Sequence, residues 1–182
     1  MILLRDIDKV LTLAGAAQKR ARGIQDEDLG IVGKQSILVS KNKIIWLGDI
    51  KRIPKEFKPQ IKKEINLKGK TVMPSFVECH THSVFAGTRR DEFELRNQGV
   101  SYQEIARKGG GILSTQRELD KISANKLLEL TQKRVNKFIQ QGVSVIEIKS
   151  GYGLDLKNEI KSLAVLKKIK GAQVVPTFLG AH

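Results

Sequence analysis

The chain has 182 residues, of which 40% are hydrophobic and 29% are charged, and its formal net charge is +14. This length and composition predict a globular protein with a real core, built from one or two domains. No apolar run approaches the roughly 20 residues that span a membrane, and charges at Arg5 and Asp6 interrupt the apolar start that a signal peptide needs. We therefore expect no membrane partner. A single cysteine excludes an internal disulfide, which fits a reducing compartment, so we expect a cytoplasmic protein.

The first predicted domain, residues 1–70, is a small β unit. Its expected strands are short and apolar, and turn residues separate them; they lie at residues 37–39, 44–47 and 65–67. Basic residues are dense between Lys51 and Lys70, where Phe57 is the only aromatic side chain and no nucleic-acid motif occurs. This pattern favours a lysine-rich solvated surface and no nucleic-acid partner. The positive charge would also attract an anionic small substrate.

The second predicted domain, residues 71–182, alternates strands and helices. The strands are almost continuously apolar and are expected at residues 71–79, 143–148 and 173–179. The helices carry an apolar stripe and are expected at residues 123–141 and 158–170. A long loop is expected between the first strand and the first helix. This alternation predicts an α/β fold in which helices cover a parallel sheet.

Two histidines one residue apart, His80 and His82, end the first of these strands. Side chains alternate faces along a strand, so both imidazoles point the same way, about 7 Å apart along the strand. This spacing favours one shared metal ion over the alternative of two hydrogen-bonded core histidines. Glu78 has the same parity, one layer below. Cys79 faces the other side, and we expect it to be a small packing residue.

Polar and glycine-rich segments follow the second and third strands as well, at Lys149–Gly153 and at Gly180–His182. In parallel α/β folds the chemistry collects at the carboxyl ends of the strands. Three strand ends with unusual residues therefore predict a functional site at this edge of the sheet.

Longer motifs surround these strand ends and occupy Pro74–His82, Val84–Gly87, Glu92–Arg96, Gly109–Thr115, Lys149–Leu154 and Thr177–His182. Together they resemble the imidazolonepropionase family, which is part of the metal-dependent amidohydrolase superfamily. A His-x-His pair alone is typical of the whole superfamily, whereas the glycine-rich motif and the motif around Tyr152 are specific to this family. The resemblance covers the chain in order.

The resemblance implies both a fold and a reaction. The fold is a (β/α)8 barrel with a small β-sandwich; residues 1–70 would be part of the sandwich, and residues 71–182 would supply the first three barrel strands. The reaction is the hydrolysis of 4-imidazolone-5-propanoate, a small anionic cyclic substrate, to N-formimidoyl-L-glutamate in histidine degradation. The resemblance also implies one divalent metal ion, zinc or iron. It is consistent with a homodimer of the whole enzyme.

By motif position, the resemblance implies metal ligands at His80 and His82, and substrate contacts at Arg89, Tyr152 and His182. Zinc-type ions lower the pKa of water to near 7, and an arginine offers a planar fork that matches a carboxylate. Glu78 would orient a ligand histidine from behind.

Other interpretations of these residues stay open from the sequence. Arg89 stands beside Arg90, so it is equally consistent with plain loop charge, and Tyr152 between two glycines is equally consistent with a turn residue. Tyr102 is a further candidate for a substrate contact. The Gly109–Gly111 segment allows either close approach to the substrate or a flexible loop.

The family's remaining metal ligands, a His and an Asp, and its acid–base residues are expected outside this chain, so no catalytic residue is assigned. Three strands cannot close an eight-stranded barrel, and a catalytic zinc normally has three protein ligands. We therefore expect the chain to be part of a longer protein and to be inactive alone. The alternatives are another cyclic amidohydrolase or deaminase of the superfamily, or a non-catalytic fragment.

Overall fold

The computed structural model describes residues 1–180. The chain forms two compact units, Met1–Pro74 and Ser75–His182, whereas the sequence predicts a boundary after residue 70. Within the described residues, no helix is both long enough and apolar enough to cross a membrane.

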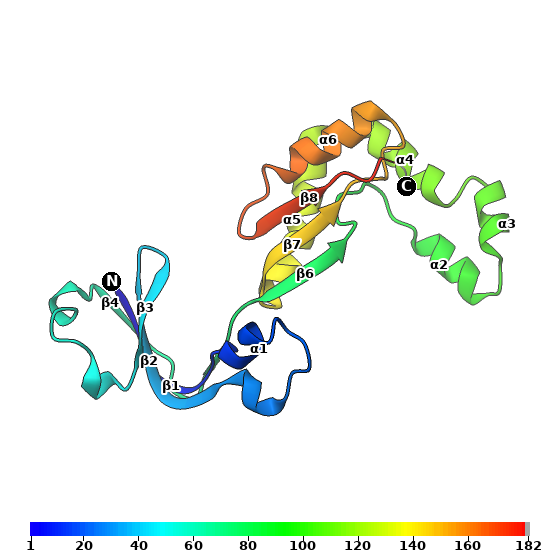
Figure 1. Cartoon of the computed structure of the whole chain (residues 1–182). Helices are drawn as coiled ribbons and strands as arrows, with labels where there is room; N and C mark the ends of the chain where they lie inside the picture. The colour runs from blue at the N-terminus through cyan, green and yellow to red at the C-terminus, as the bar shows by residue number, and fades with distance from the viewer. Residues whose placement is uncertain (181–182) are drawn as a thin grey trace. The chain divides into compact units, whose positions relative to one another are not determined.

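A five-stranded sheet forms the first unit (Figure 1), in the order β3-β2-β1-β4, with β5 also paired to β1. The strands are β1 (Ile2–Leu11), β2 (Ile31–Ser40), β3 (Lys43–Gly48), β4 (Lys63–Asn66) and β5 (Thr71–Val72). β1, β2 and β3 pair antiparallel, whereas β4 and β5 run parallel to β1. The expected turn between β2 and β3 is present, because Lys41 and Asn42 have φ angles of 46° and 62°, as a two-residue hairpin requires.

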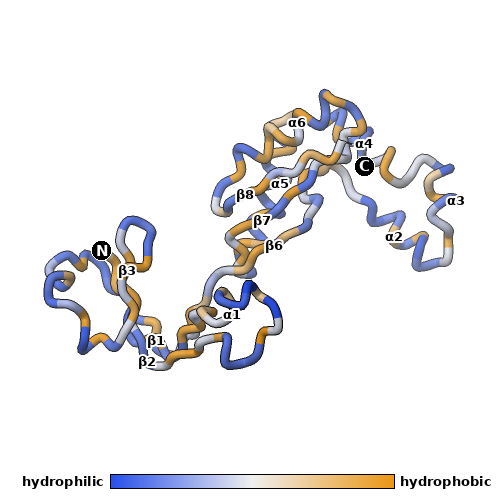
Figure 2. The backbone as a smooth tube through the Cα atoms, viewed as in Figure 1, coloured by the Kyte–Doolittle hydropathy of each residue, from blue (hydrophilic) through white to orange (hydrophobic). Residues whose placement is uncertain are grey.

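Short helical segments complete the first unit: the helix α1 (Ala14–Gln18) and the 3₁₀ turns η1 (Asp26–Leu29), η2 (Ile50–Arg52) and η3 (Lys58–Gln60). Two apolar clusters hold the sheet, one around Ile7 and the other around Leu38, and both side chains are 0% exposed. Figure 2 shows that the segment between α1 and β2 is mostly hydrophilic, as expected for a solvated loop.

A three-stranded parallel sheet organises the second unit, so the predicted α/β architecture is confirmed. Its order is β6-β7-β8, and the strands are β6 (Phe76–Thr81), β7 (Val143–Lys149) and β8 (Gln173–Thr177). The helices α5 (Ala124–Gln140) and α6 (Leu156–Leu166) lie between these strands in the chain and pack on one face of the sheet (Figure 1). There Ile146 and Ile148 of β7 form a buried cluster with Leu127 of α5 and Leu166 of α6.

Capping residues fix where these two helices begin. The side chains of Ser123 and Asp155 each accept a hydrogen bond from the backbone N–H three residues further on, at 3.2 and 2.8 Å. Gly142, with a φ of 89°, follows the end of α5 and stops it where the sequence predicted. The second helix begins earlier than its predicted range of 158–170, because Asp155 is its cap, and it ends at Leu166.

The predicted strand at residues 71–79 is wrong as a single element. Its first part is β5, which pairs with β1 in the first unit, and its second part is β6, which pairs with β7 in the second unit. Pro74 separates the two parts. It has no backbone N–H for a ladder, and its ring restricts the backbone of Met73.

The predicted long loop after β6 is also wrong, because it contains the helices α2 (Arg90–Asn97), α3 (Tyr102–Arg107) and α4 (Ile112–Lys121). Ser101 caps α3 through a hydrogen bond from the N–H of Glu104 at 3.2 Å, a Ser-x-x-Glu signal that is visible in the sequence. α4 contributes Leu119, which is 0% exposed, to the core. α2 buries none of its residues, so it has no apolar stripe from which it could be predicted.

Replacing Leu127 by Ala should destabilise the second unit. Leu127 is 0% exposed within the cluster between α5, α6 and β7, and truncation of such a residue lowers the free energy of unfolding by about 2–5 kcal/mol. Leu156→Ala is the matched control, because Leu156 is 72% exposed. Urea unfolding followed by far-ultraviolet circular dichroism compares the two variants. Equal midpoints would contradict the position of the core.

Candidate metal and substrate site

The parallel pairing of β6 with β7 brings three predicted site residues into one cluster. The ring centroids of His80 and His82 are 5.5 Å apart, and those of His82 and Tyr152 are also 5.5 Å apart. Phe85 extends the cluster, because its ring centroid lies 6.2 Å from that of Tyr152 in an edge-on arrangement. Two predicted metal ligands and one predicted substrate contact are therefore neighbours at the carboxyl ends of β6 and β7.

The end of β6 carries a bulge. Between Glu78 and Thr81, β6 holds one residue more than the segment of β7 with which it pairs. Thr81 anchors the bulge, because its Oγ1 donates a hydrogen bond to the backbone carbonyl of Glu147 at 2.9 Å. In this arrangement His80 is exposed and His82 is half-buried.

The residues beside His80 differ from the sequence expectation. Glu78 Oε1 accepts a hydrogen bond from the backbone N–H of His80 at 3.1 Å, so Glu78 fixes the backbone at this point rather than the imidazole ring. Cys79 is exposed, so the prediction that it is a packing residue is wrong. Strict alternation of faces also does not foresee the bulge between Glu78 and Thr81.

Arg89 and Tyr152 line one cavity of about 560 Å³, together with residues of the segment after β6 and of α5. Arg89 Nε donates a hydrogen bond to Glu92 Oε2 at 2.8 Å, and Glu92 Oε1 accepts one from the N–H of Gly111 at 2.9 Å. Glu92 therefore ties Arg89 to the glycine-rich segment. The hydrogen bond to Glu92 uses one of the five N–H donors of the Arg89 guanidinium.

Tyr102, the further candidate for a substrate contact, lies beside the same glycine-rich segment and is 53% exposed. A Cβ on Gly111 would lie 3.1 Å from the Tyr102 hydroxyl oxygen, and the φ of Gly111 is +72°. The positive φ is the reason for a glycine at position 111, because other residues rarely adopt it.

Arg134 of α5 is a site residue that sequence reasoning missed. Its Nη1 donates to the backbone carbonyls of Ser83 at 3.0 Å and Phe85 at 2.7 Å, and its guanidinium carbon lies 3.5 Å from the centroid of the Phe85 ring. Arg134 thus holds the segment that directly follows the histidines. Burial lowers the pKa of the Arg134 guanidinium below its ordinary value, but an arginine stays charged. The signal that could have found it is its position, i+7 from Leu127, on the buried stripe of α5.

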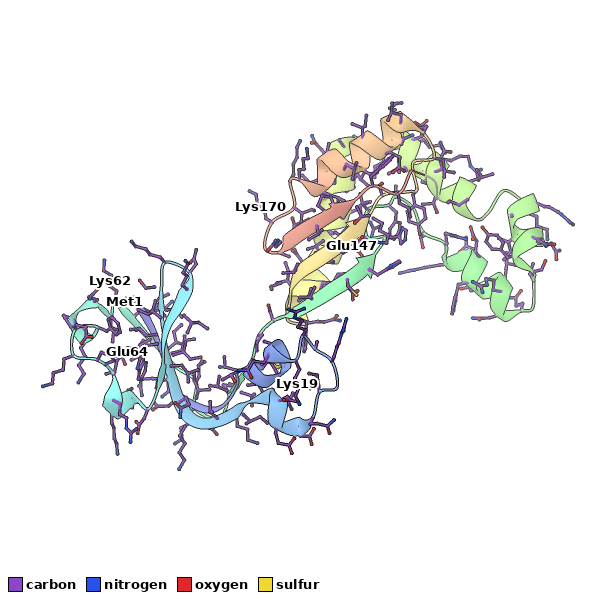
Figure 3. All side chains as sticks on the ribbon, viewed as in Figure 1. Met1, Lys19, Lys62, Glu64, Glu147 and Lys170 are labelled. Carbon is purple, nitrogen blue, oxygen red and sulfur yellow. The ribbon has the colours of Figure 1, made fainter. Side chains whose placement is uncertain are left out.

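A polar network crosses the sheet on the face opposite α5 and α6. Glu147, labelled in Figure 3, pairs with Lys149 of the same strand, and its Oε2 accepts a hydrogen bond from the N–H of Thr81 at 3.4 Å. Burial raises the pKa of Glu147, but hydrogen bonds from Lys149, Thr177 and Thr81 outweigh it, so that the pKa lies below its ordinary value. An ionised Glu147 therefore links β6, β7 and β8.

The separation of the two histidine rings is close to that expected for a shared metal ion. Two imidazoles that bind one tetrahedral zinc at about 2.0–2.1 Å have ring centroids about 5 Å apart. The observed separation of His80 and His82 is 5.5 Å. Among residues 1–180, no group of three or more His, Cys, Asp or Glu side chains could hold a metal ion. His182, predicted to contact the substrate, lies outside the described residues.

Curated proteins with similar sequences include several named imidazolonepropionase. The one from Bdellovibrio bacteriovorus is 52% identical over 182 residues, which cover 100% of this chain and 43% of that protein. One from Legionella pneumophila is 40% identical over 173 residues, which cover 93% of this chain and 41% of that protein. One from Vibrio vulnificus is 53% identical over 123 residues, covering 66% and 30%. The chain thus spans less than half the length of these curated relatives. No family model matches the chain.

Solved structures with a similar fold include two enzymes named as a chlorohydrolase and an ochratoxinase, and a guanine deaminase. Atrazine chlorohydrolase TrzN from Arthrobacter aurescens, solved with zinc, has a TM-score of 0.52 at 13% identity over 98% of this chain and 35% of that chain. Ochratoxinase from A. niger has a TM-score of 0.54 at 12% identity, covering 96% and 30%. Guanine deaminase from E. coli has a TM-score of 0.52 at 13% identity, covering 91% and 34%. At such low identities the likeness is one of fold alone.

The order of the motifs, the α/β fold and the sequence identity of 52% along all 182 residues agree with one another. The chain belongs to the imidazolonepropionase family.

Proposed function

We propose that the whole protein hydrolyses 4-imidazolone-5-propanoate to N-formimidoyl-L-glutamate, a step of histidine degradation. The observation that carries this proposal is the cluster of His80, His82 and Tyr152, together with a cavity that Tyr152 and Arg89 both line. The substrate is a small ring with an amide bond to be cleaved and a carboxylate to be held. The names of the sequence relatives support the same reaction.

His80 and His82 are proposed to hold one divalent metal ion, zinc or iron. A cyclic amide resists neutral water, and a bound metal ion supplies Lewis acidity that polarises a carbonyl and lowers the pKa of water. The separation of the two imidazoles supports this assignment. So does the zinc in the solved structure of TrzN.

Arg89 is proposed to bind the propanoate group of the substrate, because a planar guanidinium matches a carboxylate in a two-pronged hydrogen bond. Glu92 supports this role, since its carboxylate holds Arg89 through Nε at 2.8 Å. Tyr152 is proposed to donate a hydrogen bond from its hydroxyl group to the substrate. His182 is proposed as a third contact from its motif alone.

In the whole protein, β6, β7 and β8 are proposed to be the first three strands of a (β/α)8 barrel, and residues 1–70 part of a small β-sandwich. The parallel strand order, with α5 and α6 on one face, supports the barrel. Further strands would complete the interior that carries Glu147 and Lys149. A homodimer and the absence of a nucleic-acid partner stay predictions.

The double variant His80→Ala, His82→Ala of the whole protein should lose most of its bound metal, because each change removes one imidazole ligand. Elemental analysis after dialysis measures the stoichiometry. Cys79→Ala is the matched control, since this exposed residue directly precedes His80 and should leave the metal content unchanged. Unchanged stoichiometry in the double variant would sink the metal assignment.

Arg89→Ala in the whole protein should lower kcat/KM for imidazolonepropanoate by about 10- to 150-fold, since a hydrogen bond to a charged group contributes about 1.5–3 kcal/mol. Arg89→Lys should recover only part of this loss, because the charge returns without the planar fork. Arg107→Ala removes a positive charge from an exposed position on α3 and is the control. Equal kcat/KM for wild type and Arg89→Ala would show that Arg89 does not contact the substrate. No turnover by the wild type would refute the proposed reaction.

A further inference from the structure

The turn after β7 places Tyr152 between two glycines that the structure requires. Gly151 has a φ of 112°, which residues other than glycine rarely adopt. A Cβ on Gly153 would lie 2.7 Å from the backbone nitrogen of Glu159 in α6. The turn is therefore pressed against the beginning of α6, with no room for a larger residue at Gly153.

Glu159 binds the backbone on both sides of Tyr152. Its Oε1 accepts hydrogen bonds from the N–H groups of Gly151 at 3.0 Å and Gly153 at 2.7 Å, and its Oε2 accepts from Gly151 at 2.9 Å. Glu159 is only 3% exposed. It also lies in the first turn of α6, where the helix dipole favours a negative charge. These bonds are charge-assisted, and the helix end helps to offset the burial of the carboxylate.

This arrangement does more than fill space between a turn and a helix. An apolar side chain could fill the same space without the desolvation of a carboxylate, which is unfavourable in a protein interior. A carboxylate that accepts from the N–H groups of Gly151 and Gly153 restrains the Ser150–Gly151 and Tyr152–Gly153 peptides. These two peptides lie on either side of the Tyr152 Cα, so the clamp restrains the backbone that carries the Tyr152 side chain.

We propose that Glu159 is a positioning residue, which clamps the amides of Gly151 and Gly153 and thereby holds the Tyr152 ring beside His82 and Phe85. The ring centroids lie 5.5 and 6.2 Å away, respectively. The consequence for catalysis rests on the proposed function, in which Tyr152 contacts the substrate. The clamp itself is independent of the proposed function.

A double-mutant cycle in the whole protein, assayed with imidazolonepropanoate, tests the link to Tyr152. Glu159→Ala should lower kcat/KM roughly tenfold or more in the wild-type background, because the Tyr152 hydroxyl is misplaced. In the Tyr152→Phe background the same change should lower it by less than about threefold, since the hydroxyl is already gone. Glu159→Gln retains one oxygen acceptor and should fall between wild type and Glu159→Ala.

Hydrogen exchange of the segment Ser150–Leu154, measured by mass spectrometry, tests the clamp without any assay of activity. Exchange should accelerate in Glu159→Ala, because two amides lose their acceptor. Asp155→Ala is the matched control: it removes the cap of α6 and loosens the same helical turn, but leaves the carboxylate of Glu159 in place. It should change the exchange of this segment far less, and it should cost the same factor of kcat/KM with or without Tyr152→Phe.

Equal losses from Glu159→Ala in both backgrounds would show a merely structural contact and overturn the proposal. Unchanged exchange of residues 150–154 in Glu159→Ala would overturn it as well. If Tyr152→Phe alone leaves kcat/KM unchanged, the proposed reaction role of Tyr152 fails, and the exchange rates then decide on the clamp by themselves.

Discussion

The parallel pairing of β6 with β7 is the constraint on which the candidate site depends. Parallel strands end at the same edge of a sheet, so the histidines that end one strand meet the turn that follows the other. Thr81 locks this edge, because its N–H and its hydroxyl both bond to Glu147 of β7. An antiparallel pairing of the same two strands would put His82 and Tyr152 at opposite ends of the sheet.

Charged side chains that are partly or fully buried then hold the segments that leave this edge. Arg134 binds two carbonyls of the segment after the histidines, Glu159 binds the amides around Tyr152, and Glu92 binds the N–H of Gly111. Such loops have no ladder partner for their backbone groups, and buried backbone groups need one. Each charge supplies that partner from a helix. The rigidity of the candidate site therefore comes from α2, α5 and α6 as much as from the sheet.

Much of this architecture could be predicted from the sequence, and the exceptions have physical reasons. The strands β7 and β8 and the helix α5 follow from apolar runs and an apolar stripe, and the paired histidines from their spacing. The break at Pro74 was missed because β-prone residues flank it on both sides, although they belong to different sheets. α2 was missed because it buries nothing. Glu159 was missed because a sequence does not show which charges are buried, and Arg134 was missed because its position on the apolar stripe of α5 was not taken into account.

At the carboxyl end of β6, His80 and His82 are proposed to hold a metal ion next to Tyr152. The most direct measurement is a crystal structure of the whole protein loaded with zinc, with anomalous diffraction recorded at the zinc edge. The account predicts one anomalous peak within about 2.0–2.1 Å of a nitrogen of each imidazole. A peak bound elsewhere, or full zinc occupancy with either imidazole turned away from the ion, would contradict it.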